Sequence, residues 1–357
     1  MSPKTTYYAS RPVVKVDGSE EARVADELLA LHVEETVEGL ARCELRVSNW
    51  GLKDGVTTFL FFDRATLDFG SELSVTLGPP GKSGEVFKGK ITGIEGVYPL
   101  GRPPEIAILA EDRLQDLRMT RRTRSFESVS DGDVVNQIAS GHGMSAQVDH
   151  DGPTWGVLTQ VNQSDLAFLR ERARAADALM WVEDDAIHFV ARERAERETV
   201  EMTYGRELRE MTVLADLAHQ RTKVCVGGWD VSSKEGVTGE AEAGAMGSEL
   251  GGLTGGAAIL SQALGDRVDH VAHLVAFSQA EATALAEARY RDAARRFVSG
   301  VAQAEGDGRV RAGSRVALDG LGALFDGEYA VVEVRHTFDG ELGYRTHMQV
   351  ERPGIAS

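Results

Sequence analysis

The sequence predicts an α+β fold that is mostly β, with two antiparallel β-barrel domains and a small α/β domain between them. Three observations predict it. Short alternating apolar segments with Gly- and Pro-rich turns fill the first third of the chain and return at its C-terminal end, a pattern typical of barrels or sandwiches. Residues 125–192 carry helix-start signals instead. With 357 residues and 42% hydrophobic content, the chain can bury two or three cores.

Residues 1–116 are predicted to form the N-terminal β-barrel. The long alternating run 86–98 contains Gly89, Gly93 and Gly96, which favours bulges or tight bends where a sheet curls. The expected strands are 13–16, 28–37, 40–47, 73–77, 86–98 and 105–110.

Residues 117–199 are predicted to be the α/β domain. Ser130 and Asp133 have the spacing of a capping box and precede apolar residues on one helical face. Gly141 or Gly143 can end this helix, because glycine reaches the left-handed conformation without a Cβ penalty.

A second helix start and a hairpin complete this domain. Asn162 is the predicted cap, with Asp165 three residues later. Residues 179–182 and 187–190 flank the acidic segment Glu183-Asp184-Asp185, so this stretch predicts a β-hairpin with an acidic turn.

The remaining chain is divided between a second barrel and an insertion. Residues 200–232 and 300–357 are predicted to form a discontinuous β-barrel, with strands at 200–203, 208–214, 221–229, 315–318, 329–338 and 344–351. Residues 233–299 form the insertion. Its Gly-rich stretch 233–260 has few large apolar residues, so it is predicted to be mobile and to bury little surface. Ser278 and Glu281 then begin an Ala-rich helix that runs to Phe297.

The charge balance argues against nucleic acid as a partner. The chain carries 56 acidic and 39 basic residues, a net charge of −17, whereas a nucleic-acid binder needs a basic surface. The one dense basic run, residues 118–124, is interpreted as a solvated linker or a partner contact.

Compartment signals point to synthesis in the cytosol. Cys43 and Cys225 are far apart and are interpreted as reduced, buried thiols. Residues 1–8 contain no apolar core of a signal peptide, and no apolar run approaches the roughly 20 residues of a membrane span. We therefore expect assembly in the cytosol and no membrane insertion.

No catalytic, cofactor-binding or metal-binding residue is assigned. His270 and His273 lie in a strand-like segment, which would place the two imidazoles on opposite faces. The glycines in 244–256 lack the G-K-[ST] of a phosphate loop, and no G-x-S-x-G is present. The acidic runs 183–185 and 20–21 fall in predicted turns.

The order of several segments is more informative than any one motif. The runs S-V-S-D-G-D-V-V-N-Q-I-A-S-G-H-G-M, V-N-Q-S-D-L-A-F-L-R-E-R-A and A-L-M-W-V-E-D-D-A-I-H-F, followed by A-E-A-R-Y-R-D-A-A-R-R-F, resemble the phage late control protein D family. These are hub proteins of contractile tails, related to the N-terminal half of VgrG spikes. The resemblance spans about residues 8–352 and is most specific in 125–194 and 279–352.

This resemblance implies a structural baseplate hub and not an enzyme. Family members form a homotrimer whose two barrels per chain make a ring that joins a sixfold tail tube to a threefold spike. The implied partners are a separate spike protein, the tail tube protein, other baseplate proteins and cargo. The protein would leave the cytosol as part of a phage tail or injection system.

Two other function classes stay open at this point. A cell-wall hydrolase at a tail tip would need converging carboxylates or a metal site. A glycan-binding β protein would need an exposed aromatic platform, although aromatic residues are only 6% of the chain.

Overall fold

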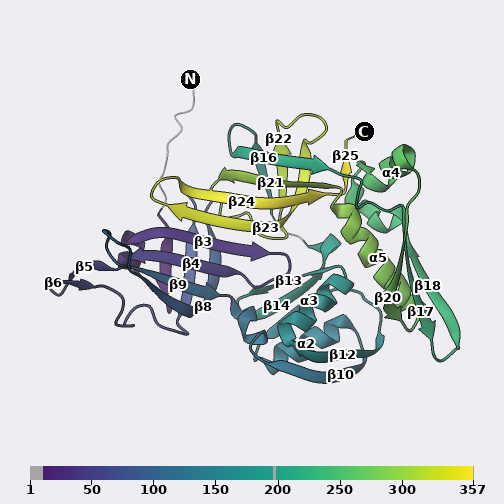
Figure 1. The fold of residues 1–357 in the computed structure, drawn as a ribbon, viewed down its shortest axis with the longest axis horizontal. Coiled ribbons are helices and arrows are strands. Elements are labelled where there is room, and N and C mark those ends of the chain that lie inside the picture. The colour runs from purple at the N-terminus through teal and green to yellow at the C-terminus, as the bar shows by residue number, and fades with distance from the viewer. Residues whose placement is uncertain (1–10, 196–197, 357) are drawn as a thin grey trace.

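The two β-rich ends of the chain hydrogen-bond into one sheet, and the predicted mostly-β class is confirmed (Figure 1). The computed structural model describes residues 11–195 and 198–356. Residues 1–8, for which no signal peptide was expected, lie outside the described residues. No helix in the described part of the chain is long and apolar enough to cross a membrane.

The N-terminal half of the sheet is antiparallel, in the order β3-β4-β9-β8-β7-β1-β2. A register shift in β8 between Ile91 and Gly93 agrees with the expected bulge. The hairpin of β5 and β6 was not predicted. The elements are β1 Val13–Val16, β2 Ser19–Glu20, α1 Ala22–Asp26, β3 Leu28–Thr36, β4 Arg42–Ser48, β5 Trp50–Lys53, β6 Val56–Phe59, β7 Glu72–Leu77, β8 Gly84–Val97, β9 Glu105–Glu111 and the 3₁₀ helix η1 Arg113–Leu117.

The central unit has the predicted helices and hairpin, with one correction. The capping box of Ser130 and Asp133 is present. The second helix is capped by Ser164 and not by Asn162, because the Ser164 side chain accepts the Ala167 N–H while Asn162 has φ +48° inside β12. The elements are β10 Arg121–Val129, α2 Asp131–Gly141, β11 Ser145–Asp149, β12 Trp155–Ser164, α3 Asp165–Ala175, β13 Ala178–Glu183, β14 Ala186–Ala191 and η2 Arg192–Arg194.

The C-terminal half continues the same sheet. Residues 333–339 of β23 pair antiparallel with residues 30–36 of β3, which makes a 13-stranded sheet. Its described strands follow an open path, and hydrogen bonds do not close either half into a ring. The elements are β15 Thr199–Thr203, β16 Leu208–Ala215, β21 Val298–Glu305, β22 Arg315–Asp319, β23 Gly327–Asp339, β24 Gly343–Arg352 and β25 Gly354–Ile355.

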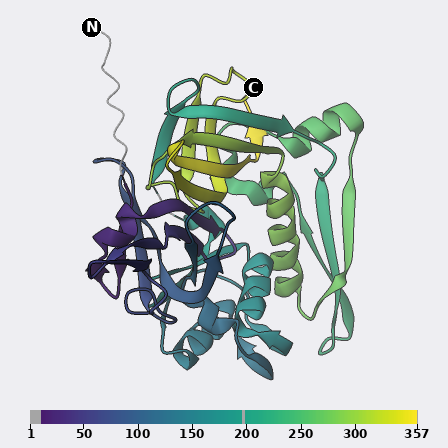
Figure 2. The same cartoon turned by 60° about the vertical axis from the view of Figure 1, so that its left-hand side comes forward.

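The remaining segment forms an arm at the far end of the molecule (Figures 1 and 2). The strand expected at 221–229 is β17, but it pairs with β18 and β20 and not with the second β half. The helix α5 covers one face of these three strands. The elements are β17 Lys223–Asp230, β18 Glu235–Ala241, η3 Ala243–Leu250, β19 Thr254–Gly255, α4 Gly256–Leu264, β20 Val268–Ala276 and α5 Gln279–Arg295.

The stretch 233–260 is exposed at about half of its residues, but a few of its residues enter the core of the arm. Met246 and Leu260 are both only 2% exposed. Small residues explain the packing: a Cβ on Gly239 would lie 2.1 Å from the backbone carbonyl of Ala282 in α5, so only glycine lets β18 approach the helix this closely.

Three separate cores support the fold. One fills the N-terminal half of the sheet and a second fills the C-terminal half. The third is shared by the central unit and the arm, where Leu169 of α3 and Tyr290 of α5 are both buried. The arm is therefore packed against the central unit by apolar contacts.

Candidate functional site

One face of the 13-stranded sheet is polar across both of its halves. In β3, Leu31 and Val33 are buried, while His32 and Glu34 point the other way, as the two-residue period of a strand requires. The register of the paired strands aligns one residue from each of eight strands in a single row: Glu210, Gln303, His347, Arg335, Glu34, Arg42, Glu111 and Lys90.

Four of the six charges in this row, named here the cross-strand row, lie beside an opposite charge. Arg335 lies 3.9 Å from Glu34, and Arg42 lies 3.6 Å from Glu111. These pairs are partly exposed, so each contributes at most about 1 kcal/mol to stability. Their main effect is on the surface, which is strongly hydrated without a large net charge.

Two grooves follow the cross-strand row. One of about 320 Å³ lies over β16, β21, β24 and β23, and one of about 860 Å³ lies over β3, β4, β8 and β9. Arg335 lines both grooves, so they meet where the two halves join. Exposed Leu109 and Met119 make part of the larger groove apolar.

A buried polar cluster lies behind the row at the junction of β3 and β23. Glu35 accepts a hydrogen bond of 2.7 Å from Nε of Arg311, which comes from the C-terminal half. The His336 ring contacts the Val310 carbonyl oxygen through Nε2 at 3.0 Å and the Tyr344 hydroxyl through Nδ1 at 2.8 Å. Burial lowers the pKa of His336 to about 4, so the ring is neutral and its proton resides on Nε2, facing the carbonyl.

The acidic turn predicted from the sequence docks the central unit on the N-terminal half. Asp184 lies 3.1 Å from Nζ of Lys88, and Asp185 forms an ion pair with Arg113. These residues line a cavity of about 630 Å³ where the central unit and both halves of the sheet meet. The turn is therefore a structural contact between units.

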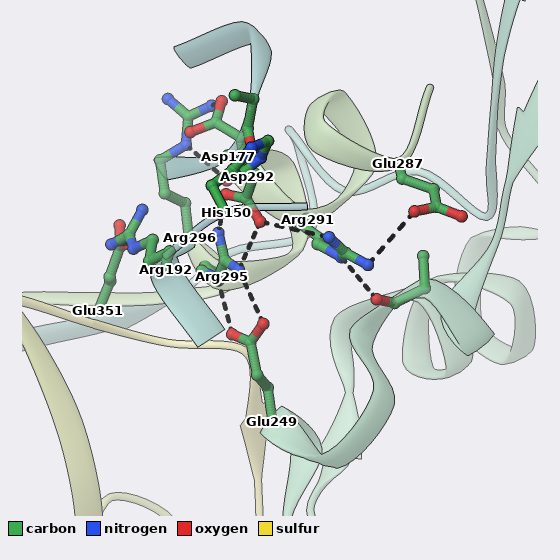
Figure 3. Close-up of polar contacts among 12 residues, drawn as sticks. His150, Asp177, Arg192, Glu249, Glu287, Arg291, Asp292, Arg295, Arg296 and Glu351 are labelled. Atoms are coloured by element: carbon green, nitrogen blue, oxygen red, sulfur yellow. Dashed lines mark hydrogen bonds and ion pairs between the residues drawn. The ribbon is translucent and has the colours of Figure 1, made fainter. Parts of the chain in front are cut away.

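A second junction is centred on an arginine of α5 (Figure 3). Arg295 is only 3% exposed, and its guanidinium lies between two carboxylates. Its Nη2 donates to Asp177 at 2.8 Å, and its Nε donates to Glu249 at 2.7 Å. Arg291, one turn earlier in the helix, donates to the Ala245 carbonyl oxygen at 2.7 Å.

The three charged groups of this Arg295 junction come from two units, because Arg295 and Glu249 belong to the arm and Asp177 to the central unit. Asp177 follows α3 in the central unit and has φ +52°, whereas Glu249 belongs to η3 in the Gly-rich stretch. Burial opposes the charge of Glu249, but its hydrogen bonds to Arg295 and the nearby positive charge lower its pKa overall. The junction orients the arm relative to the central unit.

The basic run at 118–124 is exposed apart from the half-buried Arg124, and two of its arginines bind a carboxylate of the central unit. Arg122 and Arg124 lie 3.2 and 2.6 Å from the carboxylate of Asp165, which begins α3. Burial opposes ionisation of Asp165, but hydrogen bonds from His142 and Gln160 and the nearby arginines lower its pKa. This part of the run stabilises the pairing of β10 and β12.

The two histidines and the second acidic pair singled out in the sequence lie in separate parts of the fold. His270 and His273 are both exposed on β20, and Glu20 and Glu21 lie at β2 and at the start of α1. Among the described residues, no group of three or more His, Cys, Asp or Glu side chains is arranged to hold a metal ion.

Sequence reasoning missed both the cross-strand row and the Arg295 junction. Strand alternation was visible, but register between distant strands was not. The charged groups of the row and of the junction bind one another and hold the units of the fold in place.

Comparisons with known proteins give a family and a fold. The model of the family described as the Alg8 N-terminal domain matches residues 9–340. This match does not confirm the expected late control protein D family. A search of curated proteins gives no match.

Solved structures share the fold over nearly the whole chain. The 43 kDa tail protein of prophage MuSo2 from Shewanella oneidensis is 12% identical, with a TM-score of 0.69, and the match covers 96% of this chain and 98% of that one. The tail protein from Neisseria meningitidis MC58 is 12% identical, with a TM-score of 0.68 and 98% of both chains covered.

A secretion-system component is also similar. The E. coli c3393 protein, described as a component of the type VI secretion system, is 12% identical with a TM-score of 0.58, and the match covers 95% of this chain and 76% of that one.

Proposed function

This chain belongs to the Alg8 N-terminal domain family, and from its fold we propose that it is a structural hub protein of a contractile tail or injection system. It assembles as a homotrimer and joins a sixfold tail tube to a threefold spike. It contacts the tube protein, the spike and other baseplate proteins, and it performs no catalysis.

The observation that carries this proposal is the likeness to tail proteins over almost the full length of both chains. The likeness therefore concerns the arrangement of all the units and not one shared small domain. At 12% identity the likeness concerns the fold, so the assembly role is our inference from it.

The sheet suits a part that transmits force between layers. Each chain has two β units with separate cores, and a trimer would present six such units. Backbone hydrogen bonds between β3 and β23 join the two units, so they move together under load. Side-chain contacts alone would allow one core to slide past the other.

The polar sheet face is our candidate for the wall of the central channel. Its cross-strand row carries three acidic and three basic side chains, so a wall built from it would be balanced in charge even though the whole chain is acidic. A hydrated wall whose charges are balanced gives passing cargo little to bind.

The test is the mass of the purified protein, by light scattering and sedimentation, followed by imaging of particles that contain it. We expect a mass three times that of one chain and density at the tube–spike junction of sheathed particles. A monomer at all concentrations that never enters a particle contradicts the proposal.

A further inference from the structure

The β5–β6 hairpin lies at one end of the long axis (Figure 1). Exposed aromatic side chains gather on it and beside it. Trp50 and Phe59 are opposite each other, with ring centroids 5.2 Å apart, and Tyr98 lies 6.5 Å from Phe59. Leu52, on the same face of β5, is 67% exposed, and Tyr98 is 66% exposed. The hairpin patch is defined by Trp50, Leu52, Phe59, Phe62 and Tyr98.

This hairpin is held in place and projects as a fixed surface. Asp54 and Gly55 both have positive φ, +53° and +80°, as a tight two-residue hairpin turn requires. Arg23 donates to the Leu52 carbonyl oxygen at 2.6 Å, and Lys53 forms an ion pair with Asp63. The apolar side chains are therefore presented to solvent at no further cost in ordering.

A second apolar patch lies on the arm, at the opposite end of the long axis (Figures 1 and 2). Gly228 and Ala276 are paired across β17 and β20, and Ala276 is fully buried. The residues that alternate with them face away from α5. Among these, Trp229, Val275 and Phe277 are 53%, 58% and 52% exposed, and they define the sheet patch.

The sheet patch is flat. A Cβ on Gly227, in the same strand as Trp229, would meet no atom within 4 Å, and the same holds for Gly236, which is paired with Trp229. Thr238, which is paired with Gly227, is small, so the surface beside Trp229 has little relief and suits a projecting hairpin.

The size of these patches indicates a protein partner. A fully enclosed aromatic side chain buries on the order of 150–250 Å². At the observed exposures, the patch offers several hundred Å², which approaches the roughly 800 Å² that one partner contributes to a standard interface.

We propose that the hairpin patch of one copy packs on the sheet patch of the next copy, which is the head-to-tail contact of the trimer proposed above. This inference rests on the proposed function. Pairing two hairpin patches would leave both sheet patches exposed. A head-to-tail contact instead covers both patches of every chain once the ring closes.

Cysteine cross-linking tests the contact directly. Leu52→Cys and Val275→Cys are made in separate, differently tagged chains that are expressed together and treated with a short bismaleimide. The native thiols interfere little, because Cys43 and Cys225 are 3% and 7% exposed. We expect a covalent dimer only when both variants are present. A covalent dimer from Leu52→Cys alone, or none from the mixture, overturns the contact.

A charge variant tests its contribution to assembly. Leu52→Lys should raise the concentration at which the trimer forms by about tenfold or more, as expected for the loss of a central apolar contact. Leu342→Lys is the matched control, because Leu342 is 56% exposed in the turn after β23 and lies outside both patches. Equal effects of the two variants overturn the inference.

The outcomes separate this inference from the function itself. A wild-type trimer that is unaffected by Leu52→Lys contradicts the hairpin contact and leaves the hub proposal standing. A wild-type protein that stays monomeric contradicts both. Binding of soluble cell-wall glycan that is lost with Tyr98→Ser, without a change in mass, would assign the hairpin patch to glycan instead.

Discussion

Replacing Arg295 by methionine is expected to be among the most destabilising single changes in this chain. The variant keeps most of the apolar stem but removes the charge that lies between Asp177 and Glu249. These carboxylates are 8% and 14% exposed, so the change leaves two acidic groups in a site that water barely reaches. Removing one partner of a buried ion pair costs about 3–5 kcal/mol.

The lower end of that range, about 3 kcal/mol, is the better expectation here. Arg291 remains 3.7 Å from Asp177 and offsets part of its charge. Glu249 can also take up a proton. In the wild type, Arg295 holds the pKa of Glu249 below its usual range. Without its hydrogen bonds and charge, the effect of burial, which raises that pKa, is opposed by the weaker effects of Arg192 and Arg291.

The measurement is urea unfolding of wild type and variant at a fixed protein concentration, at pH 7 and pH 5. The difference in unfolding free energy should be about 3 kcal/mol at pH 7 and smaller at pH 5, because a lower pH favours protonation of the unpaired Glu249 in the variant. Arg296→Met is the control: its ion pair with Asp292 is about half exposed, so its loss should cost less than about 1 kcal/mol.

Two results would refute this reasoning. The first is an Arg295→Met variant no less stable than Arg296→Met. The second is a difference in stability that does not change with pH, because the unpaired carboxylate of Glu249 should be ionised to a greater extent at the higher pH. Adding Glu249→Gln to Arg295→Met should restore part of the loss, since it removes an unpaired buried charge.

Three further outcomes are expected. Gly239→Ala should destabilise the protein by about 2 kcal/mol or more, because its Cβ meets the α5 backbone, whereas Gly227→Ala in the neighbouring strand should be nearly neutral in the same urea titration. Burial lowers the pKa of His336 to about 4, so the stability that its neutral form contributes is fully present above pH 6.5 and is lost as the pH falls. Acidification from pH 7 to pH 4.5 should therefore lower the unfolding free energy by about 2 kcal/mol through this group. His336→Gln should remove most of this dependence of stability on pH. Burial raises the pKa of Asp112 to about 7, so the stability that its protonated form contributes is present at low pH and is lost as the pH rises through 7. The unfolding free energy of Asp112→Asn should therefore rise relative to that of the wild type between pH 5 and pH 8. A difference in unfolding free energy that stays constant over this range would contradict the expectation.

Local signals predicted much of the central unit. The capping box of Ser130 and Asp133 and the hairpin around Glu183 depend on contacts within a few residues, so one sequence contains them. The β5–β6 hairpin was missed even though Asp54-Gly55 is a hairpin-turn signal, because the strands beside it are only four residues long.

Contacts between distant segments could not be predicted in the same way. Arg295 is 118 residues from Asp177 and 46 from Glu249, and nothing in their local sequence links them. The cross-strand row depends on the register of eight strands, and a shift of one residue in any of them would turn its side chains to the other face. The composition of the Gly-rich stretch did not show that some of its small residues pack closely onto α5.

The two kinds of junction in this fold have different mechanical consequences. The halves of the sheet are joined by backbone hydrogen bonds between β3 and β23, which do not depend on side-chain charge. The arm is held on the central unit by apolar packing and by the Arg295 junction, which depends on three ionised groups. Since the arm carries the sheet patch, its orientation sets the angle between successive copies in a head-to-tail ring. Arg295→Met should therefore weaken assembly at concentrations where each chain is still folded, and a trimer of unchanged affinity in that variant would show that the arm is oriented by apolar packing alone.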